Sequence, residues 1–199
     1  MHGAEAIVIN CNFLSTPAVA KQRLPKAYRV EPLDSKLRKE RTKLEAKIMH
    51  RAKSTGTLCP LVLNVDLDKC ELIQTRLDGE KLVSYLEKNS NDADAAVLQN
   101  AGVQLAKLHL AGISHGDSTT SNFMVMGGGA VAVFDFGLSQ FDASLEEQAI
   151  DLLLFSKSVS QQQFKHFTKG YGKERGKKET QKLLTQVAEI QSRARYVER

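Results

Sequence analysis

Apolar and polar positions along the first part of the chain follow a pattern that predicts β-strands. β-Branched residues at 7–9 indicate a first strand, and Ala18–Lys21 indicates a second. Two further apolar runs, residues 59–65 and 69–77, are separated by Asp66-Leu-Asp68 and predict a hairpin. The chain up to residue 78 is therefore expected to be rich in strands.

Helical spacing of apolar residues occurs once in this first part and dominates the second. Residues 34–52 predict a helix that Asp34 or Ser35 can cap. Gly112 is expected to end a later helix. The helices predicted in the second part span residues 82–86, 97–110, 146–155, 161–171 and 183–190. Strands followed by helices predict an α+β protein.

The composition is that of a water-soluble globular protein. Of 199 residues, 42% are hydrophobic and 26% are charged. No apolar run approaches the roughly 20 residues needed to span a bilayer, and the N-terminus lacks the basic and apolar regions of a signal peptide. Cys11, Cys59 and Cys70 show no CxxC spacing, which favours reduced, mostly buried thiols in the cytoplasm or nucleus.

The net charge of +5 is concentrated in two basic blocks. Residues 21–53 hold 12 Lys and Arg against 4 Asp and Glu, and residues 165–199 hold 10 against 4. The rest of the chain is acidic. This distribution suggests a polyanionic partner such as RNA or nucleotide phosphates. Solvated helix faces explain either block alone equally well.

One stretch in the second part carries residues suited to phosphoryl transfer. His115-Gly-Asp117 is followed five residues later by Asn122, and Asp135-Phe-Gly137 closes a short apolar run. Phosphoryl transfer to a hydroxyl needs a carboxylate that orients the hydroxyl and oxygen ligands that hold Mg²⁺ against the ATP phosphates. These two motifs supply such groups at the spacing found in kinases. Their occurrence in this order predicts a phosphoryl-transfer site.

Earlier segments complete the expected site. Ala18-Val-Ala-Lys21 resembles the kinase strand whose lysine holds the α- and β-phosphates. Glu45 lies beside the apolar stripe of the predicted helix and can reach Lys21. From local sequence alone, a lysine and a glutamate that face solvent are the favoured interpretation. The presence of the whole set of motifs reverses that preference. Residues 74–79 are expected to form the hinge that holds an adenine ring.

Several features of regulated protein kinases are absent from the sequence. Only 15 residues separate Asp135 from Asp151, with no Ala-Pro-Glu between them. Gly116 stands where an arginine would receive a phosphorylated activation loop, and Thr119 replaces a lysine that often neutralises the transferred phosphoryl group. The chemistry of ATP and Mg²⁺ is thus retained without the machinery that recognises and regulates peptide phosphorylation.

Together these motifs resemble the PRPK-type small atypical kinases, the kinase/ATPase subunit of the KEOPS complex. The resemblance covers nearly the whole chain, and its most specific part is His115-Gly-Asp-Ser-Thr-Thr-Ser-Asn122. It implies a reduced two-lobed protein-kinase-like fold, with a β-rich N-lobe over residues 1–78, a helical C-lobe over 79–199 and no extended activation segment. It also implies a non-specific serine/threonine kinase with ATPase activity that serves threonylcarbamoyl-adenosine modification of tRNAs reading ANN codons.

The resemblance also implies roles for individual residues and partners. Asp117 would be the catalytic base or would orient water, and Asn122 and Asp135 would bind Mg²⁺. The residues expected to bind ATP are Gly3, Ala4, Glu5, Lys21, Glu45, Gln74, Thr75 and Leu77. The expected partners are the threonylcarbamoyl-transferase subunit on the C-lobe, a small KEOPS subunit on the N-lobe, and tRNA on the basic tail from residue 173.

Two other readings remain open. The segment around Gly3 has one glycine where the usual phosphate-covering loop has three, which is compatible with a catalytically weak scaffold that binds the transferase and tRNA. A RIO-type kinase or a small-molecule phosphotransferase would also lack an activation loop. The Asp135-Phe-Gly137 motif and the Thr-Thr-Ser-Asn run argue against that third reading.

Overall fold

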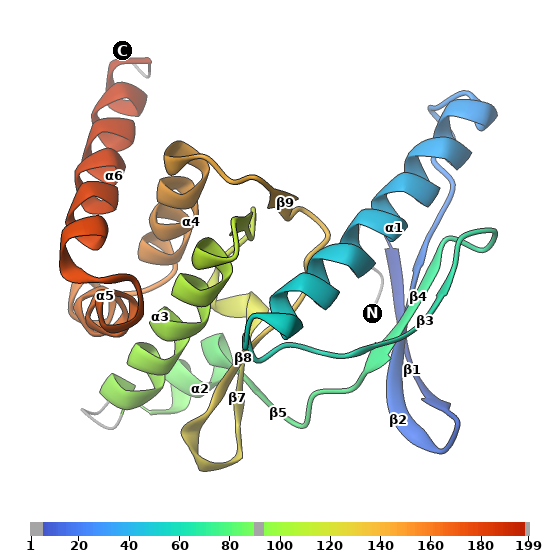
Figure 1. Ribbon diagram of the computed structural model, residues 1–199, viewed down its shortest axis with the longest axis horizontal. Coiled ribbons are helices and arrows are strands. Elements are labelled where there is room, and N and C mark those ends of the chain that lie inside the picture. The colour runs from blue at the N-terminus through green and yellow to red at the C-terminus, as the bar shows by residue number, and fades with distance from the viewer. Residues whose placement is uncertain (1–5, 90–93, 198–199) are drawn as a thin grey trace.

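The protein has a strand-rich N-terminal region and a helical C-terminal region, as a computed structural model of residues 6–89 and 94–197 shows (Figure 1). The N-terminal region is one antiparallel sheet in the order β1-β2-β4-β3, with helix α1 beside it. Its elements are β1 (Ala6–Phe13), β2 (Thr16–Arg23), α1 (Glu31–Ser54), β3 (Val62–Asp66) and β4 (Glu71–Thr75). The predicted α+β, two-lobed, reduced kinase-like fold is confirmed.

The predicted hairpin in this region is present, with strands shorter than the apolar runs suggested. β3 and β4 pair antiparallel, and the Asp66 carboxylate accepts hydrogen bonds from the backbone N–H groups of Asp68 and Lys69, each at 3.0 Å. This Asp66 turn fixes the register of the hairpin. β4 then lies against β2, with Lys21 opposite Leu72.

Helix α1 begins earlier than the sequence predicts. It starts at Glu31, after Val30, and Pro32 occupies its first turn, where the fixed φ of proline suits a helix start. The expectation that Asp34 or Ser35 caps the helix is therefore wrong. Asp34 is instead buried, and its carboxylate accepts a hydrogen bond from Arg38 at 2.6 Å.

The C-terminal region consists of helices around α3 and two small sheets. The sheets are ordered β5-β7-β8 and β6-β9. The elements are β5 (Gly79–Lys81), α2 (Leu82–Lys88), α3 (Asp94–Leu110), β6 (Ile113–Ser114), η1 (Thr120–Asn122), β7 (Phe123–Met126), η2 (Gly127–Gly129), β8 (Val131–Val133), β9 (Gln140–Phe141), α4 (Leu145–Lys157), α5 (Gln161–Arg175) and α6 (Lys177–Val197). The chain crosses between the regions over residues 76–78. The division after residue 78 stays a prediction.

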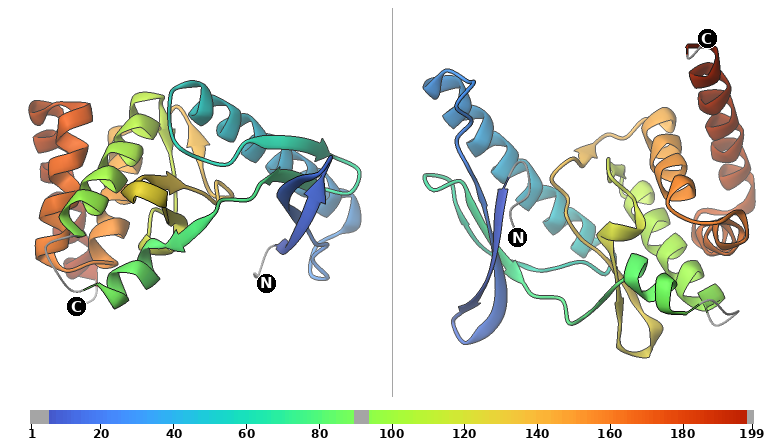
Figure 2. Two further views of the ribbon diagram at one scale, coloured as in Figure 1. Left: turned by 90° about the horizontal axis from the view of Figure 1, so that it is seen from below. Right: turned by 180° about the vertical axis from the view of Figure 1, so that it is seen from behind.

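The predicted tail is an ordered helix that contributes to the core. In Figures 1 and 2, α6 lies along α4 at the edge farthest from the N-terminal sheet. Leu183 is fully buried and Val187 nearly so. Helix α5 packs tightly on α3. A Cβ atom added at Gly170 in α5 would lie only 1.9 Å from the Gln99 carbonyl oxygen in α3. The segment from Lys173 is thus part of the folded C-terminal region.

Two further expectations can be compared with the structure. All three cysteines are free thiols, with Cys59 and Cys70 buried and Cys11 half-buried. Burial raises the pKa of the Cys59 thiol to about 11. Reduced, mostly buried thiols were expected. No helix in the described ranges is both long enough and apolar enough to cross a membrane.

Candidate active site

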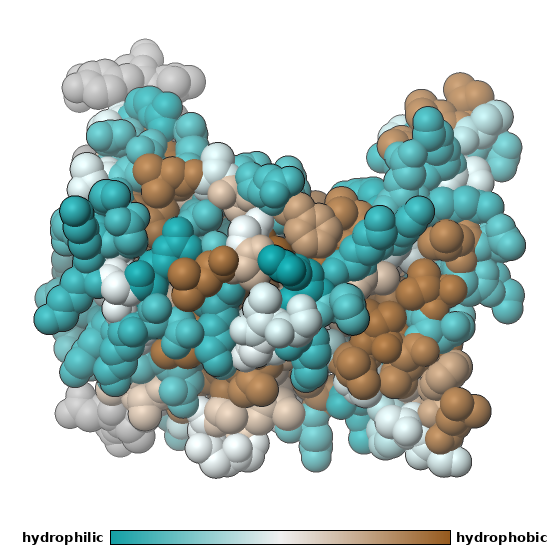
Figure 3. Space-filling view, viewed as in Figure 1, coloured by the Kyte–Doolittle hydropathy of each residue, from teal (hydrophilic) through white to brown (hydrophobic). Residues whose placement is uncertain are grey.

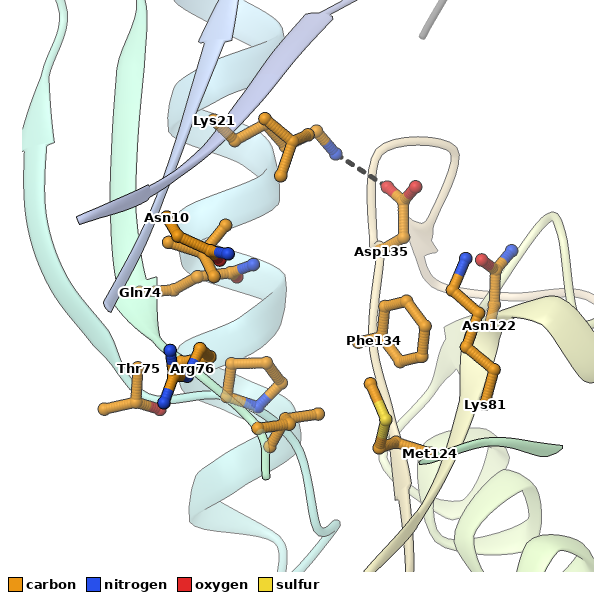
Figure 4. A pocket seen from close by; sticks show the side chains of 14 residues that line it. Asn10, Lys21, Gln74, Thr75, Arg76, Lys81, Asn122, Met124, Phe134 and Asp135 are labelled. Carbon is orange, nitrogen blue, oxygen red and sulfur yellow. Dashed lines mark hydrogen bonds and ion pairs between the residues drawn. The ribbon is translucent and has the colours of Figure 1, made fainter. Parts of the chain in front are cut away.

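A cavity of about 380 Å³ lies between the N-terminal sheet and the β7–β8 hairpin (Figure 4). Val8 and Val19 line it from the sheet, whereas Met124 and Phe134 line it from the C-terminal region. These apolar side chains form opposite walls of a slot. The slot has the shape and chemistry needed to hold a flat aromatic ring, with polar groups at both ends.

The cavity is polar and charged where Lys21 faces the Asp135 turn. The Lys21 ammonium is 2.7 Å from a Glu45 carboxylate oxygen and 2.6 Å from an Asp135 oxygen, and Figure 4 shows the second contact. Strand β2, helix α1 and the turn after β8 each contribute one of these residues. The structure therefore brings together three predicted site residues that are up to 114 positions apart in the chain.

Arg23 is a second cation that binds the same glutamate. Its guanidinium donates to the second oxygen of Glu45 at 2.6 Å, and both side chains are almost fully buried. Because Arg23 is two residues after Lys21 on a strand, both side chains lie on one face of the sheet. Glu45 is thus held by two cations, which fixes the carboxylate that orients Lys21.

The Asp135 side chain is set at the cavity by an unusual backbone conformation. Its φ is +64°, in the left-handed region that few non-glycine residues adopt. Partial burial would raise the pKa of its carboxyl, but the charge and hydrogen bond of Lys21 outweigh burial and lower it. Asp135 is therefore a carboxylate at neutral pH, with its side chain 51% exposed.

The loop after β6 carries the other predicted catalytic group. The Asn122 side-chain amide donates to the Asp117 carboxylate and to the Asp117 backbone carbonyl, both at 2.8 Å. These bonds use the amide nitrogen and leave the Asn122 side-chain oxygen to face the cavity, which Asn122 lines. His115 stabilises the same loop by accepting the Asp117 backbone N–H at 3.2 Å.

A buried hydrogen-bonded chain anchors this loop to the helices. Asp151 in α4 accepts the backbone N–H groups of His115 at 2.6 Å and Gly116 at 2.8 Å. The same carboxylate is 3.1 Å from Nε2 of His109, whose Nδ1 is 2.7 Å from the Tyr171 hydroxyl in α5. The hydroxyl donates to Nδ1, so Nε2–H donates to Asp151. These hydrogen bonds connect α5 to the loop after β6.

The pKa values of His109 and Asp151 leave one negative charge in this hydrogen-bonded series of side chains. Burial lowers the pKa of His109, so the imidazole is neutral. Burial alone would raise the pKa of Asp151, but hydrogen bonds from His109 and the backbone outweigh it and lower that pKa. The result is a buried carboxylate whose partners are all N–H donors.

Gly116 is required because the segment around Leu138 passes very close to the loop after β6. Its φ is +79°, and an added Cβ atom would lie 2.4 Å from the Leu138 carbonyl oxygen. Any side chain here, arginine included, needs the segment after Asp135-Phe-Gly137 to move. Ser139 adds a second restraint by donating to the His115 carbonyl at 2.8 Å.

The residues of the predicted hinge lie at the other end of the cavity. Gln74, Thr75 and Leu77 all line it. The Thr75 backbone N–H and hydroxyl are occupied by Leu61. Among the described residues, by contrast, the Leu77 backbone N–H has no hydrogen-bond partner and follows the end of β4. A backbone donor of this kind at the edge of an apolar slot suits a purine ring nitrogen.

The predicted residues are thus distributed around one cavity, with one exception. Lys21, Gln74, Thr75, Leu77, Asn122 and Asp135 line it, while Glu45 and Asp117 each contact one of these. Gly3, Ala4 and Glu5 lie outside the described residues. Sequence reasoning did not single out Arg23, His109 and Tyr171, which hydrogen-bond to Glu45 or support the loop after β6. It also did not single out Lys81, which lines the cavity. For Arg23 the period-two spacing from Lys21 was the available signal.

The fold and the site define a small protein of the protein-kinase-like class. No family model matches the chain. It is, however, 39% identical over 188 residues to the "KEOPS complex subunit Bud32" of Pyrococcus abyssi, which covers 91% of this chain and 85% of that protein. It is 36% identical to the "Probable serine/threonine-protein kinase BUD32 homolog" of Archaeoglobus fulgidus over 91% of this chain and 89% of that protein. The chain belongs to the Bud32 family.

Some relatives are much longer than this chain. A "Probable bifunctional tRNA threonylcarbamoyladenosine biosynthesis protein" of Methanobrevibacter smithii is 37% identical over 98% of this chain, but the match covers only 36% of that protein. The chain therefore spans about a third of these bifunctional relatives.

Proposed function

We propose that the chain binds ATP with Mg²⁺ and transfers or hydrolyses the terminal phosphoryl group, as a serine/threonine kinase with ATPase activity. The observation that carries this proposal is the contact of Lys21 with both Glu45 and Asp135 at one end of the cavity. Kinase phosphoryl transfer requires such a lysine–glutamate ion pair and, next to it, an aspartate that can hold Mg²⁺.

The residues present fit Mg²⁺ and a nucleotide. Asn122 and Asp135 offer amide and carboxylate oxygens, and Mg²⁺ is usually held by one or two protein oxygens together with substrate phosphates. Bound Mg²⁺ would neutralise charge on the phosphates. Val8, Val19 and Met124 would enclose the base, and the Leu77 N–H would bind its edge.

Each catalytic residue then has a defined task. Lys21 binds phosphate oxygens, and Glu45 with Arg23 keeps it in position. Asp117 orients a hydroxyl or a water molecule and receives its proton as the oxygen bonds to the γ-phosphorus and the bond to ADP breaks. The Asn122 amide keeps the Asp117 carboxylate pointing toward that oxygen.

The test is ATP turnover by purified wild type and by three matched Asp→Asn variants. Asp117→Asn and Asp135→Asn should each lower turnover by about 10²-fold or more, since each removes a carboxylate used in the reaction. Asp142→Asn is the control, because Asp142 is exposed in a turn with φ +54° that asparagine also tolerates. Turnover retained in both site variants contradicts the proposal.

Measuring MgATP binding to the wild-type protein distinguishes an enzyme from a scaffold. Isothermal calorimetry with MgATP should give a measurable heat of binding in wild type. Absence of binding, together with intact assembly with a partner, would instead support the scaffold reading. Binding of ATP without any turnover, alone or with partner and tRNA, would also support it.

We further propose that the chain works within a KEOPS assembly for threonylcarbamoyl-adenosine modification of tRNAs reading ANN codons. The names of its relatives support this, one as a KEOPS subunit and others as bifunctional proteins of that biosynthesis. The long relatives contain a further part beyond the third that this chain matches. A separate threonylcarbamoyl-transferase subunit on the C-lobe, and a small subunit on the N-lobe, would complete the assembly in the cytoplasm or nucleus.

The basic tail is the proposed tRNA contact. Lys177, Lys178 and Lys182 are exposed on α6, and the α6 side of the molecule is largely hydrophilic (Figure 3). Because α6 also buries Leu183, deleting the tail would damage the core. Replacing the three lysines by glutamine is the cleaner test and should weaken tRNA binding and reduce its salt dependence. An unchanged salt slope contradicts this contact.

A further inference from the structure

The cavity holds a cation whose charge no neighbouring acid compensates. The charges of Lys21 and Arg23 are matched by those of Glu45 and Asp135. Lys81 also lines the cavity, but no carboxylate among the described residues forms an ion pair with it. Its ammonium instead lies 5.9 Å from the centre of the Phe134 ring, in a cation–π contact.

The nearest acid in sequence is engaged elsewhere. Glu80 forms an ion pair with Lys88 in α2, on the outer surface. Lys81 is half-buried, with its stem along the cavity wall and its ammonium available to a ligand. Lys81 is therefore placed to meet an anion that enters the cavity.

The strand register fixes where this cation lies. Lys81 is directly opposite Met124 in the β5–β7 pair, and directly opposed side chains lie on one face of a sheet. Asn122, the residue just before β7, lines the cavity together with Met124, whereas Phe123 between them is fully buried. Figure 4 shows Lys81 and Asn122 at the same wall of the cavity, with Phe134 next to them.

This position is intermediate between the two ends of the site. Leu77, at the base end, precedes Lys81 by four residues along the hinge, and Asn122 belongs to the metal end. The part of a nucleotide that joins base and metal-bound phosphates is the ribose with the α-phosphate. Magnesium-bound ATP keeps a net negative charge, which the balanced set around Lys21 does not neutralise.

We propose that Lys81 is a further nucleotide-binding residue whose ammonium contacts the α-phosphate. Arg76, at the Thr75–Leu77 end of the cavity, is a second lining cation without an ion pair among the described residues, whereas Lys81 supplies positive charge next to Asn122, on the wall opposite Lys21. The site consequently selects adenine nucleotides over adenosine through Lys81. This inference rests on the proposed function, since it assigns one more contact within the same site.

The test is a ligand series measured by calorimetry with adenosine, AMP, MgADP and MgATP. In Lys81→Met the three phosphorylated ligands should bind about tenfold more weakly, a typical loss for one charge-assisted contact. Adenosine should change by less than about twofold. Lys81→Arg should recover most of the affinity, and Lys157→Met, an exposed lysine at the end of α4, should match wild type.

Each other outcome overturns the assignment in a recognisable way. Unchanged affinity for all four ligands in Lys81→Met excludes the contact. An equal loss for adenosine and the nucleotides means that Lys81 acts by packing on Phe134. A loss that appears with MgATP but not AMP places the contact at another phosphate. Wild type that binds none of the nucleotides instead refutes the proposed function itself. Thermal melting of each variant checks the fold, with Lys81→Gln as substitute if the methionine variant melts early.

Discussion

Replacing Asp151 by asparagine should destabilise the protein far more than so small a change in shape suggests. The carboxylate is fully buried and accepts three N–H groups, from the His115 and Gly116 backbones and from the His109 ring, at 2.6, 2.8 and 3.1 Å. All three neighbours are donors. An asparagine side chain offers one acceptor oxygen and one NH₂ group. In either orientation the NH₂ group therefore faces at least one of these N–H donors.

The size of the effect follows from that count. In the better orientation the asparagine oxygen accepts from His115 and His109, while its NH₂ faces the Gly116 N–H. One hydrogen bond to a charged group is then lost, which costs about 1.5–3 kcal/mol, and the two others become weaker neutral bonds. We expect the free energy of unfolding to fall by about 3 kcal/mol.

Urea unfolding followed by circular dichroism measures this difference. Asp142→Asn, in an exposed turn, is the matched control and should stay within about 0.5 kcal/mol of wild type. Because the folded-state pKa of Asp151 is lowered, its contribution is present above the unfolded value of about 3.9 and is lost as pH falls through the folded value. The gap between Asp151→Asn and wild type should therefore be constant from about pH 6 to 8 and narrow in acid. A loss below about 1 kcal/mol at pH 7 would refute the reasoning.

Three other substitutions test the surroundings of the site. Gly116→Ala should lower the free energy of unfolding by about 3 kcal/mol in urea, from its positive φ and its clash with the Leu138 carbonyl; a neutral result contradicts the close approach. Tyr171→Phe should cost about 1 kcal/mol by thermal melting, since His109 loses its donor, and an unchanged melting temperature rules out that bond. Glu45→Gln should raise KM for ATP and destabilise by about 3 kcal/mol, because two nearly buried cations lose their shared carboxylate. Equal KM values would speak against the positioning of Lys21.

The sequence allowed much of the fold to be anticipated because its signals are local. Period-two and helical spacing located the hairpin of β3 and β4 and most helices, and Gly112 ends α3 as expected, with φ +74°. The start of α1 was misjudged because Asp34 has the chemistry of a cap but is used in a side-chain pair with Arg38. Local patterns cannot separate these two uses of a carboxylate.

In the candidate site, too, local motifs indicated some residues, whereas contacts that depend on tertiary packing could not be predicted. Motif spacing selected Lys21, Glu45 and Asp135, and the structure brings these three side chains into contact. Their roles in binding ATP and Mg²⁺ stay predictions. The spacing gave no indication of the buried chain from Tyr171 to Asp151, because those residues come from helices that meet only through packing. Lys81 was missed for a similar reason: its position opposite Met124 depends on strand register, which the three-residue strand β5 does not reveal in sequence.

The clamp between Gly116 and Leu138 bears on how such a protein can be controlled. The segment after Asp135 is held against the loop after β6 by close backbone contact and by the Ser139 hydrogen bond. The segment is short, and Gly116 replaces the arginine that would bind a phosphate on it. Phosphorylation is therefore not expected to switch the segment between two positions. We therefore expect the site to be controlled from outside this segment, by the ligands that enter the cavity or by a partner bound next to it.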